Sequence, residues 1–279
     1  MADYGIDDLE NTRYNFSKWM VGALRSACST RWPQKEWMDQ SRSLSNWINR
    51  HWLAMFNSLV GLFVLGALVA PAAMKAGYTG PAKALYTIYG FTCHQLPQRS
   101  YFLFGRSLMY PANQISEGWP EAGSLLEQRS IVGDPDFGYK VAIANRCSAI
   151  YPTILFAGFI FSLRRRRVKA LSMKGFIALS FPMGLDGGSH LISEITRTGF
   201  RDANVWLQVL TRNAFAPDFY VGDALGSVNW LFRTLSGALF GIAIVWFAYP
   251  ILAQAFTETS LPSASGEVSD GSSLPMKPG

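Results

Sequence analysis

Cysteine and histidine are both scarce in this sequence, with three of each among 279 residues. Three scattered cysteines do not make the framework of disulfide bonds that holds small secreted domains together. Charged residues are scarce as well, at 16% of the chain, whereas hydrophobic residues make up 49%. This composition is too apolar for an ordinary soluble domain, and it indicates a membrane protein that crosses the bilayer several times.

Two further classes are disfavoured by the start of the chain and by the distribution of charge. The first ten residues include Asp3, Asp7, Asp8 and Glu10 and contain no apolar core, so we expect no cleavable signal peptide. The net charge of +6 does not indicate nucleic acid as a partner, because the basic residues cluster beside apolar segments. Such clusters are typical of topology signals and of contacts with anionic lipid, so the expected partner is the lipid bilayer.

Four apolar segments are long enough for the roughly 20 residues that cross a hydrocarbon core. The predicted spans are about 53–74, 141–163, 175–195 and 228–252. A fifth apolar segment, at 82–94, is too short to cross and is predicted to form an interfacial or re-entrant helix. The predicted fold class is an all-α integral membrane protein with about four transmembrane helices and this one short helix.

Basic residues predict the orientation of these spans. Residues 1–52 carry seven Lys or Arg, and the short loop at 164–174 carries six. Lys and Arg in short loops mark the cytoplasmic side, and these two clusters share one side only if the 82–94 segment does not cross. We therefore expect four crossings with both termini in the cytoplasm, in the cytoplasmic membrane of a bacterium.

Three regions are predicted along the chain. Residues 1–51 form a cytoplasmic amphipathic region, whose four tryptophans favour either helices on the membrane surface or a small packed cap. Residues 52–256 form the membrane domain. Residues 257–279 are rich in Ser, Pro and Gly and are predicted to be disordered.

The most unusual stretch begins at Cys93 and brings a thiol, an imidazole, an amide and a guanidinium into seven positions beside an apolar segment. A polar cluster at membrane depth is costly, and it is therefore a candidate functional site. In the predicted topology, polar residues of three other spans converge on the same outer leaflet. The candidate polar site comprises Cys93, His94, Gln95, Arg99, Arg146, Cys147, Asp186, His190, Glu194 and Arg233.

The spacing of three of these residues predicts a polar stripe on one helix. Asp186, His190 and Glu194 follow one another at intervals of four residues, so they share a helix face. An unpaired carboxylate is costly there, and we expect Asp186 or Glu194 to pair with Arg146 or Arg233. Ion pairs that only fix the packing of the helices would give the same pattern.

Several chemistries could use this cluster. Cys93, His94, Cys147 and His190 offer sulfur and nitrogen ligands for zinc, copper or an iron cofactor such as haem, although none of them has the spacing of a zinc finger. Cys93 and Cys147 could instead form a disulfide in an oxidising compartment. Catalysis on a lipid-borne substrate by His94 or by a Cys93 thiolate is a third alternative, and plain packing is a fourth.

Four motifs together resemble a known family. CHQLPQRSYFLFG, NRCSAIY, PMGLDGGSH and NWLFRTLSGALFG occur in this order, and the chain resembles over about 85–250 the family called domain of unknown function 2085. Its members are predicted polytopic membrane proteins of bacteria and archaea, and the overall style is similar to members from the phylum Chloroflexota. The family implies no assigned activity.

The resemblance has two departures. Ala144 stands where relatives usually carry a cysteine, and His190 stands where they tend to carry glutamine. The missing thiol weakens a metal site built from three cysteines, and by its position His190 could replace that ligand.

Three functions are therefore open. The first hypothesis is a membrane protein that depends on a metal or redox cofactor, such as a redox enzyme. The second is a non-catalytic subunit or an assembly factor of a membrane complex. A transporter is the third hypothesis and is disfavoured, because the chain has only four predicted spans and no inverted repeat of the kind from which many transporters are built.

Overall fold

The computed structural model describes residues 34–164 and 168–258. The chain divides into two compact units at residue 50, and the description that follows concerns residues 51–258 unless it says otherwise. Most of the predicted N-terminal region and nearly all of the predicted disordered tail lie outside the described residues.

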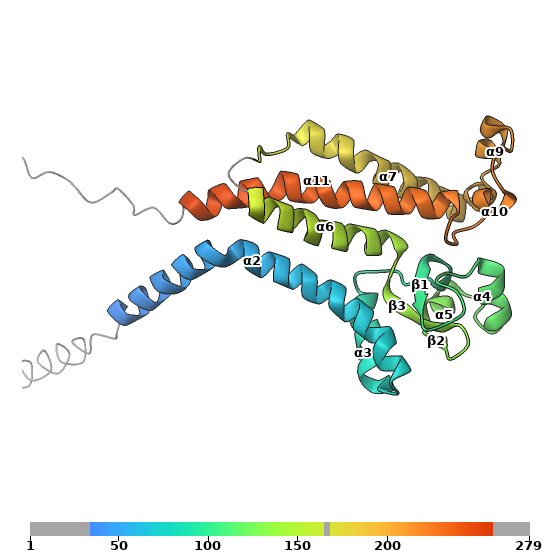
Figure 1. Ribbon diagram of the computed structural model, residues 1–279, viewed down its shortest axis with the longest axis horizontal. Coiled ribbons are helices and arrows are strands. Elements are labelled where there is room, and N and C mark those ends of the chain that lie inside the picture. The colour runs from blue at the N-terminus through green and yellow to red at the C-terminus, as the bar shows by residue number, and fades with distance from the viewer. Residues whose placement is uncertain (1–33, 165–167, 259–279) are drawn as a thin grey trace, which may run out of the picture. The chain divides into compact units, whose positions relative to one another are not determined.

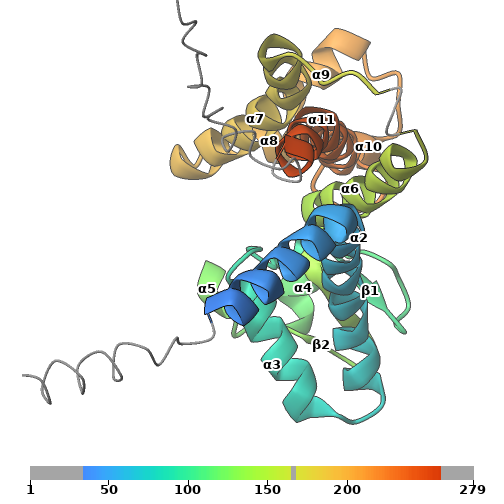
Figure 2. The same cartoon turned by 90° about the vertical axis from the view of Figure 1, so that its left-hand side faces the viewer.

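Four long helices make up most of the chain. They are α2 (Gln34–Lys75), α6 (Asn145–Arg164), α7 (Met173–Ile195) and α11 (Val228–Glu258). Helix α11 lies between α6 and α7 (Figures 1 and 2). Near the far ends of α6 and α11, Trp52 of α2 is buried in an apolar cluster with Phe161 and Tyr249.

Small residues allow α6 and α11 to approach closely. A Cβ atom built on Gly237 would lie 2.9 Å from the carbonyl oxygen of Arg146, and one on Gly241 would lie 2.8 Å from the carbonyl oxygen of Ile150. These two glycines are four residues apart on one face of α11. This is the small-residue spacing that lets helix backbones pack against each other in membranes.

Within the described residues, three helical segments are long and apolar enough to cross a membrane. They are Ser43–Lys75, Asn145–Arg164 and Val228–Thr257. The predicted span at 175–195 is a helix, α7, but this helix does not belong to that set. Polar residues such as Asp186 and Glu194, together with several glycines, lower the mean hydropathy of α7. Three of the four predicted spans are therefore confirmed as candidates, and the fourth is confirmed only as a long helix.

The short apolar segment at 82–94 is also helical over most of its length. Helix α3 runs from Thr79 to Gly90, and the chain then turns into a loop that carries Cys93 and His94. Gln95 in this loop has a positive φ of 52°, a backbone conformation that is uncommon outside glycine.

The prediction of an all-α fold is wrong in one region, because a small antiparallel sheet lies between α3 and α6. Its strands are β1 (Ser100–Leu103), β2 (Gly133–Asp134) and β3 (Gly138–Ala144), in the order β1-β3-β2. Ser100 pairs with Ala144, and Phe102 pairs with Lys140. A short apolar run is consistent with a buried strand as well as with a helix, so residues 141–144 belong to the sheet and the second span begins at Asn145.

Short helices fill the two connecting regions. Before β2 the chain forms the 3-10 turn η1 (Pro97–Arg99) and the helices α4 (Ala112–Gly118) and α5 (Leu125–Ser130). Between α7 and α11 it forms α8 (Phe200–Ala203), α9 (Val205–Thr211) and α10 (Pro217–Tyr220).

Candidate functional site

Charged side chains form a continuous network at one end of the helix bundle, where α6 begins, α7 ends and α11 begins (Figure 1). The long helices α6, α7 and α11 supply five members, and the segments that connect the long helices supply three. We call this set the arginine network, and its members are Arg99, Arg146, Asp186, His190, Glu194, Arg201, Asp223 and Arg233.

Asp186 is one centre of the network. Its carboxylate is buried and accepts hydrogen bonds from Nη2 of Arg146 at 2.5 Å and from Nη2 of Arg201 at 2.9 Å. The predicted pairing of Asp186 with Arg146 is therefore present, and Arg201 is an additional partner. Two guanidiniums offset the cost of taking the carboxylate out of water.

Asp223, in the loop before α11, is the other centre. Its carboxylate accepts a hydrogen bond from Nε of Arg99 at 2.8 Å and forms an ion pair with Nη1 of Arg233 at 2.6 Å. Burial by itself would raise the pKa of Asp223, but the charges of Arg233 and Arg99 outweigh it and hold the pKa at about 2. Asp223 therefore stays ionised at neutral pH.

The predicted stripe lies on α7, and its three members have different surroundings. Asp186 and His190 are buried, whereas the side chain of Glu194 is 45% exposed. Glu194 accepts a hydrogen bond from Nη2 of Arg99 at 2.7 Å. Glu194 therefore pairs with neither of the arginines that the sequence suggested.

His190 links the two centres. Its ring lies 3.3 Å from Nη2 of Arg201 and 3.1 Å from Nη2 of Arg233. A guanidinium has only donors, so the ring nitrogen that faces it must accept. This arrangement favours the neutral imidazole over the imidazolium ion.

The ion-paired side chains of the network carry more positive than negative charge. Its four arginines face three carboxylates, which leaves one excess positive charge when the histidine is neutral. Among the described residues, Nε of Arg146 and Nε of Arg201 are buried donors without a hydrogen-bond partner. Buried donors of this kind are costly, and an acceptor would stabilise them.

A small polar cavity lies within this network. It has a volume of about 120 Å³ and is lined by His94, Arg99, Ala144, Asn145, Arg146, Gly187, His190, Leu191, Glu194 and Arg233. Gly187 helps to keep it open, because a Cβ atom at this position would lie 3.1 Å from Nη1 of Arg146. The cavity therefore presents three guanidiniums, two imidazoles and one carboxylate to a ligand.

His94 is the only part of the Cys93-His94-Gln95 run that lines this cavity. Its Nδ1 accepts a hydrogen bond from the backbone N–H of Leu96 at 3.1 Å. Loss of water around the ring, and then the charge of Arg99, lower the pKa of His94 to about 4, although the residue as a whole is exposed. The ring is therefore neutral at physiological pH.

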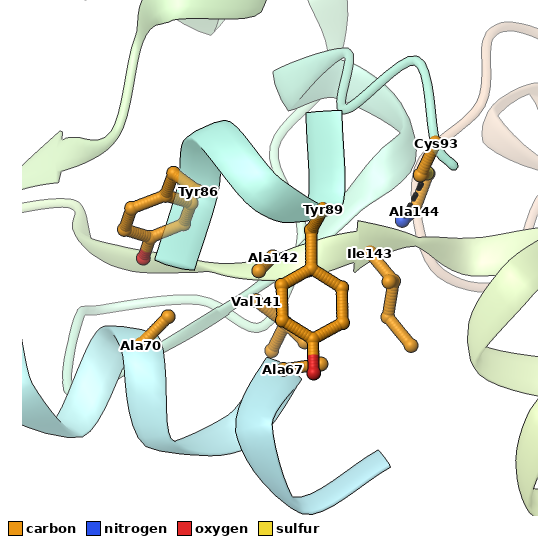
Figure 3. Close-up of a cluster of buried hydrophobic side chains, with 9 residues drawn as sticks. All are labelled: Ala67, Ala70, Tyr86, Tyr89, Cys93, Val141, Ala142, Ile143 and Ala144. Atoms are coloured by element: carbon orange, nitrogen blue, oxygen red, sulfur yellow. Dashed lines mark hydrogen bonds between the residues drawn. The ribbon is translucent and has the colours of Figure 1, made fainter. Parts of the chain in front are cut away.

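Cys93 and Gln95 instead anchor the loop to the sheet. The sulfur of Cys93 accepts a hydrogen bond from the backbone N–H of Ala144 at 3.2 Å, as Figure 3 shows. Nε2 of Gln95 donates to the carbonyl oxygens of Tyr86 and Ala142, at 2.8 and 2.9 Å. These contacts fix the loop that presents His94 and Arg99 to the network.

Cys93 and Cys147 lie in the same apolar cluster and are both free thiols. A hydrogen bond from the Cys147 side chain outweighs the effect of burial and lowers the pKa of Cys93 to about 6. The disulfide, one of the alternatives left open by the sequence, is absent from the structure because both cysteines are free thiols, although they are neighbours.

The four predicted metal ligands do not form one cluster. Cys93 and Cys147 pack in the apolar cluster beside β3, whereas His94 and His190 line the polar cavity. Across residues 34–164 and 168–258, no group of three or more Cys, His, Asp or Glu side chains could hold a metal ion.

Two central members of the network, Arg201 and Asp223, were missed in the sequence. Both lie in connecting segments next to a predicted span, where a charged residue is ordinarily taken as solvated. For Asp223 the available signal was the count of charges, since Asp186 and Glu194 alone leave the three predicted arginines unbalanced. Buried asparagines fix the two segments: Asn229 donates to the carbonyl oxygens of Arg201 and Gly222, at 2.6 and 2.9 Å.

Together, the long apolar helices and the buried charged network at their ends define a multi-pass integral membrane protein. Residues 127–247 match the family described as predicted membrane protein (DUF2085), and this match confirms the family that the motifs indicated. Three of the four motifs fall within the matched segment, whereas CHQLPQRSYFLFG lies before it. The matched segment contains every member of the arginine network except Arg99.

One curated relative is an uncharacterized protein of Methanocaldococcus jannaschii. It is 25% identical to this chain over 138 residues, which are 47% of this chain and 67% of that protein. No solved structure matches the chain. The relative is archaeal and does not test the similarity to Chloroflexota proteins.

Proposed function

We propose that this membrane protein binds an anionic ligand through the arginine network. One observation carries this proposal: four buried or half-buried guanidiniums face only three carboxylates, and two of them keep unpartnered buried donors. A ligand with one negative charge and several acceptor oxygens would neutralise the excess charge and accept from these donors. Arginine is the residue best suited to phosphate and carboxylate groups, which it binds through paired hydrogen bonds.

The ligand-binding end of the bundle is proposed to face the outer leaflet, with α7 as a fourth span. In support, Ala67 and Ala70 in the last turns of α2 lie in one cluster with Cys147 in the first turns of α6. The chain between α2 and α6 therefore begins and ends at the same end of the bundle, as expected if α3 does not cross. The basic cluster that begins at Arg164 then falls at the opposite, cytoplasmic end in the cytoplasmic membrane of a bacterium.

Thermal unfolding with and without inorganic phosphate tests the proposed function. The full chain in mild detergent is heated in sodium phosphate or in sodium chloride of equal ionic strength. At tenfold excess over Kd, phosphate should add about 1.4 kcal/mol of stability. For a protein of this size, the corresponding rise in Tm is roughly 3–5 °C.

Arg146→Gln should abolish this rise, because it removes a guanidinium that lines the cavity and is only half-buried. Arg197→Gln is the matched control, since Arg197 is exposed and lies outside the network. Equal stabilisation of wild type and the Arg146 variant by phosphate would contradict the proposal.

The predicted metal or redox cofactor is a weaker candidate, because its four ligands divide between two places. Elemental analysis and absorption spectra of the purified protein test it.

A subunit or assembly role is the second candidate function. It is favoured by the outer region around α5, where Leu125 and Leu126 are 62% and 76% exposed. Co-purification with partners in fixed stoichiometry would support that role, and a single species without partners would count against it.

A further inference from the structure

A large apolar groove lies directly beside the arginine network. It has a volume of about 700 Å³ and runs along α7 and α11. Its walls are formed mainly by apolar side chains, among them Pro182, Leu185, Phe232, Leu235 and Leu239. A volume of this size falls within the range of 300–1,000 Å³ typical of small-molecule sites.

Two charged side chains also line this groove. Asp186 and Arg201 line it, and their ion pair belongs to the arginine network. Arg201 is 5% exposed, and its Nε donor has no hydrogen-bond partner among the described residues. Its guanidinium also lies 5.8 Å from the centre of the Phe232 ring, which lines the groove as well. An acidic end of a ligand in this groove would lie beside the guanidinium of Arg201.

The same side chains separate the groove from the polar cavity. Arg201, in the groove, donates to Asp186 and contacts His190, and His190 lines the cavity. Arg146, in the cavity, donates to the other oxygen of Asp186. The apolar groove therefore borders the arginine network, and this combination matches a molecule with an apolar chain and an anionic head.

We propose that the groove binds one anionic phospholipid, with an acyl chain between α7 and α11 and its phosphate at Arg201. This proposal deepens the proposed function and rests on it, because it names the class of anion that the arginine network receives. Charge complementarity selects an anionic over a zwitterionic headgroup, since the excess charge of the network is positive. Trp206 at the groove is 46% exposed, as expected of an aromatic residue at the level of the headgroups.

Native mass spectrometry of the full chain in mild detergent tests the lipid assignment. The protein is titrated with phosphatidylglycerol or with phosphatidylcholine, and the lipid-bound fraction is measured at each concentration. Wild type should bind phosphatidylglycerol more tightly than phosphatidylcholine by about fivefold, the effect of one arginine near a charged headgroup.

Two variants fill the groove without disturbing the buried core. Leu185→Trp and Leu235→Trp enlarge side chains that are 61% and 52% exposed and that line the groove. Each should lower the affinity for phosphatidylglycerol by about fivefold or more, since the acyl chain loses its place. Ile192→Trp is the matched control, because Ile192 is 57% exposed on the same helix and does not line the groove.

The outcomes separate this inference from the proposed function. If the groove variants bind phosphatidylglycerol as wild type does, or if wild type does not discriminate between the two lipids, the lipid assignment is overturned. The stabilisation by inorganic phosphate would in that case still support a small free anion in the cavity. Loss of lipid binding in the groove variants without any effect of inorganic phosphate would overturn the binding of a small free anion in the cavity. The headgroup contact at Arg201 would still be made through the arginine network.

Discussion

Arg99 and Asp223 are 124 residues apart in the sequence, yet Nε of Arg99 donates to Oδ2 of Asp223 at 2.8 Å. This bond joins the loop after α3 to the loop before α11. Arg99 also reaches Glu194 at the end of α7. A single guanidinium therefore ties together three segments, and Asp223 holds it in place together with Arg233.

Asp223→Asn should destabilise the protein strongly. The variant leaves the buried guanidiniums of Arg99 and Arg233 without their counter-charge, and breaking a buried ion pair in this way costs about 3–5 kcal/mol. Chemical unfolding in detergent measures the loss. Asp218→Asn is the control, because Asp218 is exposed. A similar loss of stability in both variants would show that the ion pairs of Asp223 do not stabilise the protein.

The same carboxylate predicts an acid-dependent loss of stability. The pKa of Asp223 is about 2 in the folded protein and 3.8 in the unfolded chain, because Arg233 and Arg99 outweigh the effect of burial. Its contribution is complete above pH 4 and is lost as the pH falls toward 2, which amounts to about 2 kcal/mol. The free energy of unfolding, measured between pH 5 and pH 2, should therefore fall less steeply with decreasing pH for Asp223→Asn than for wild type. Parallel curves would contradict the assignment.

Lys140 should make the stability of the protein depend on pH, which an exposed lysine with an ordinary pKa would not do. Its side chain is fully buried in β3, and burial lowers its pKa from 10.5 to about 7. Between these values the unfolded chain holds more protons than the folded protein, so stability should rise as the pH increases from 7 toward 10. Lys140→Met should remove this rise relative to wild type in thermal unfolding. An unchanged slope in the variant would exclude Lys140 as its source.

The long helices could be predicted from the sequence, since apolar length is a strong local signal. The boundary at Asn145 could not, because Val141 to Ala144 are apolar in either structure and only pairing with β1 decides that they form a strand. The polar stripe on α7 also followed from spacing. Its partners did not, because the positions of Arg201 and Asp223 depend on how two connecting segments fold back through hydrogen bonds to Asn204 and Asn229.

Gly237→Ala should separate α6 from α11. The added Cβ would lie 2.9 Å from the carbonyl oxygen of Arg146, and that backbone atom cannot yield without moving the helix. Overpacking of this kind costs about 1–3 kcal/mol. Gly184→Ala in α7 is the control, since a Cβ there meets nothing within 4 Å and should be neutral or slightly stabilising. Equal Tm values for the two variants would argue against close packing at Gly237.

Mild oxidation should join Cys93 and Cys147 in a disulfide. The two thiols are neighbours, and a hydrogen bond from Cys147 lowers the pKa of Cys93, which favours the reactive thiolate at this position. With an added disulfide reagent, the Cys93 thiolate attacks one sulfur and releases one thiol. Cys147 then displaces the second thiol and closes the bond. In a Cys28→Ser background, alkylation followed by mass spectrometry should show both sites protected before reduction and both labelled after it. Persistent labelling of both thiols after oxidation would mean that the pair cannot close, and the cysteines would then serve only to pack the loop against β3.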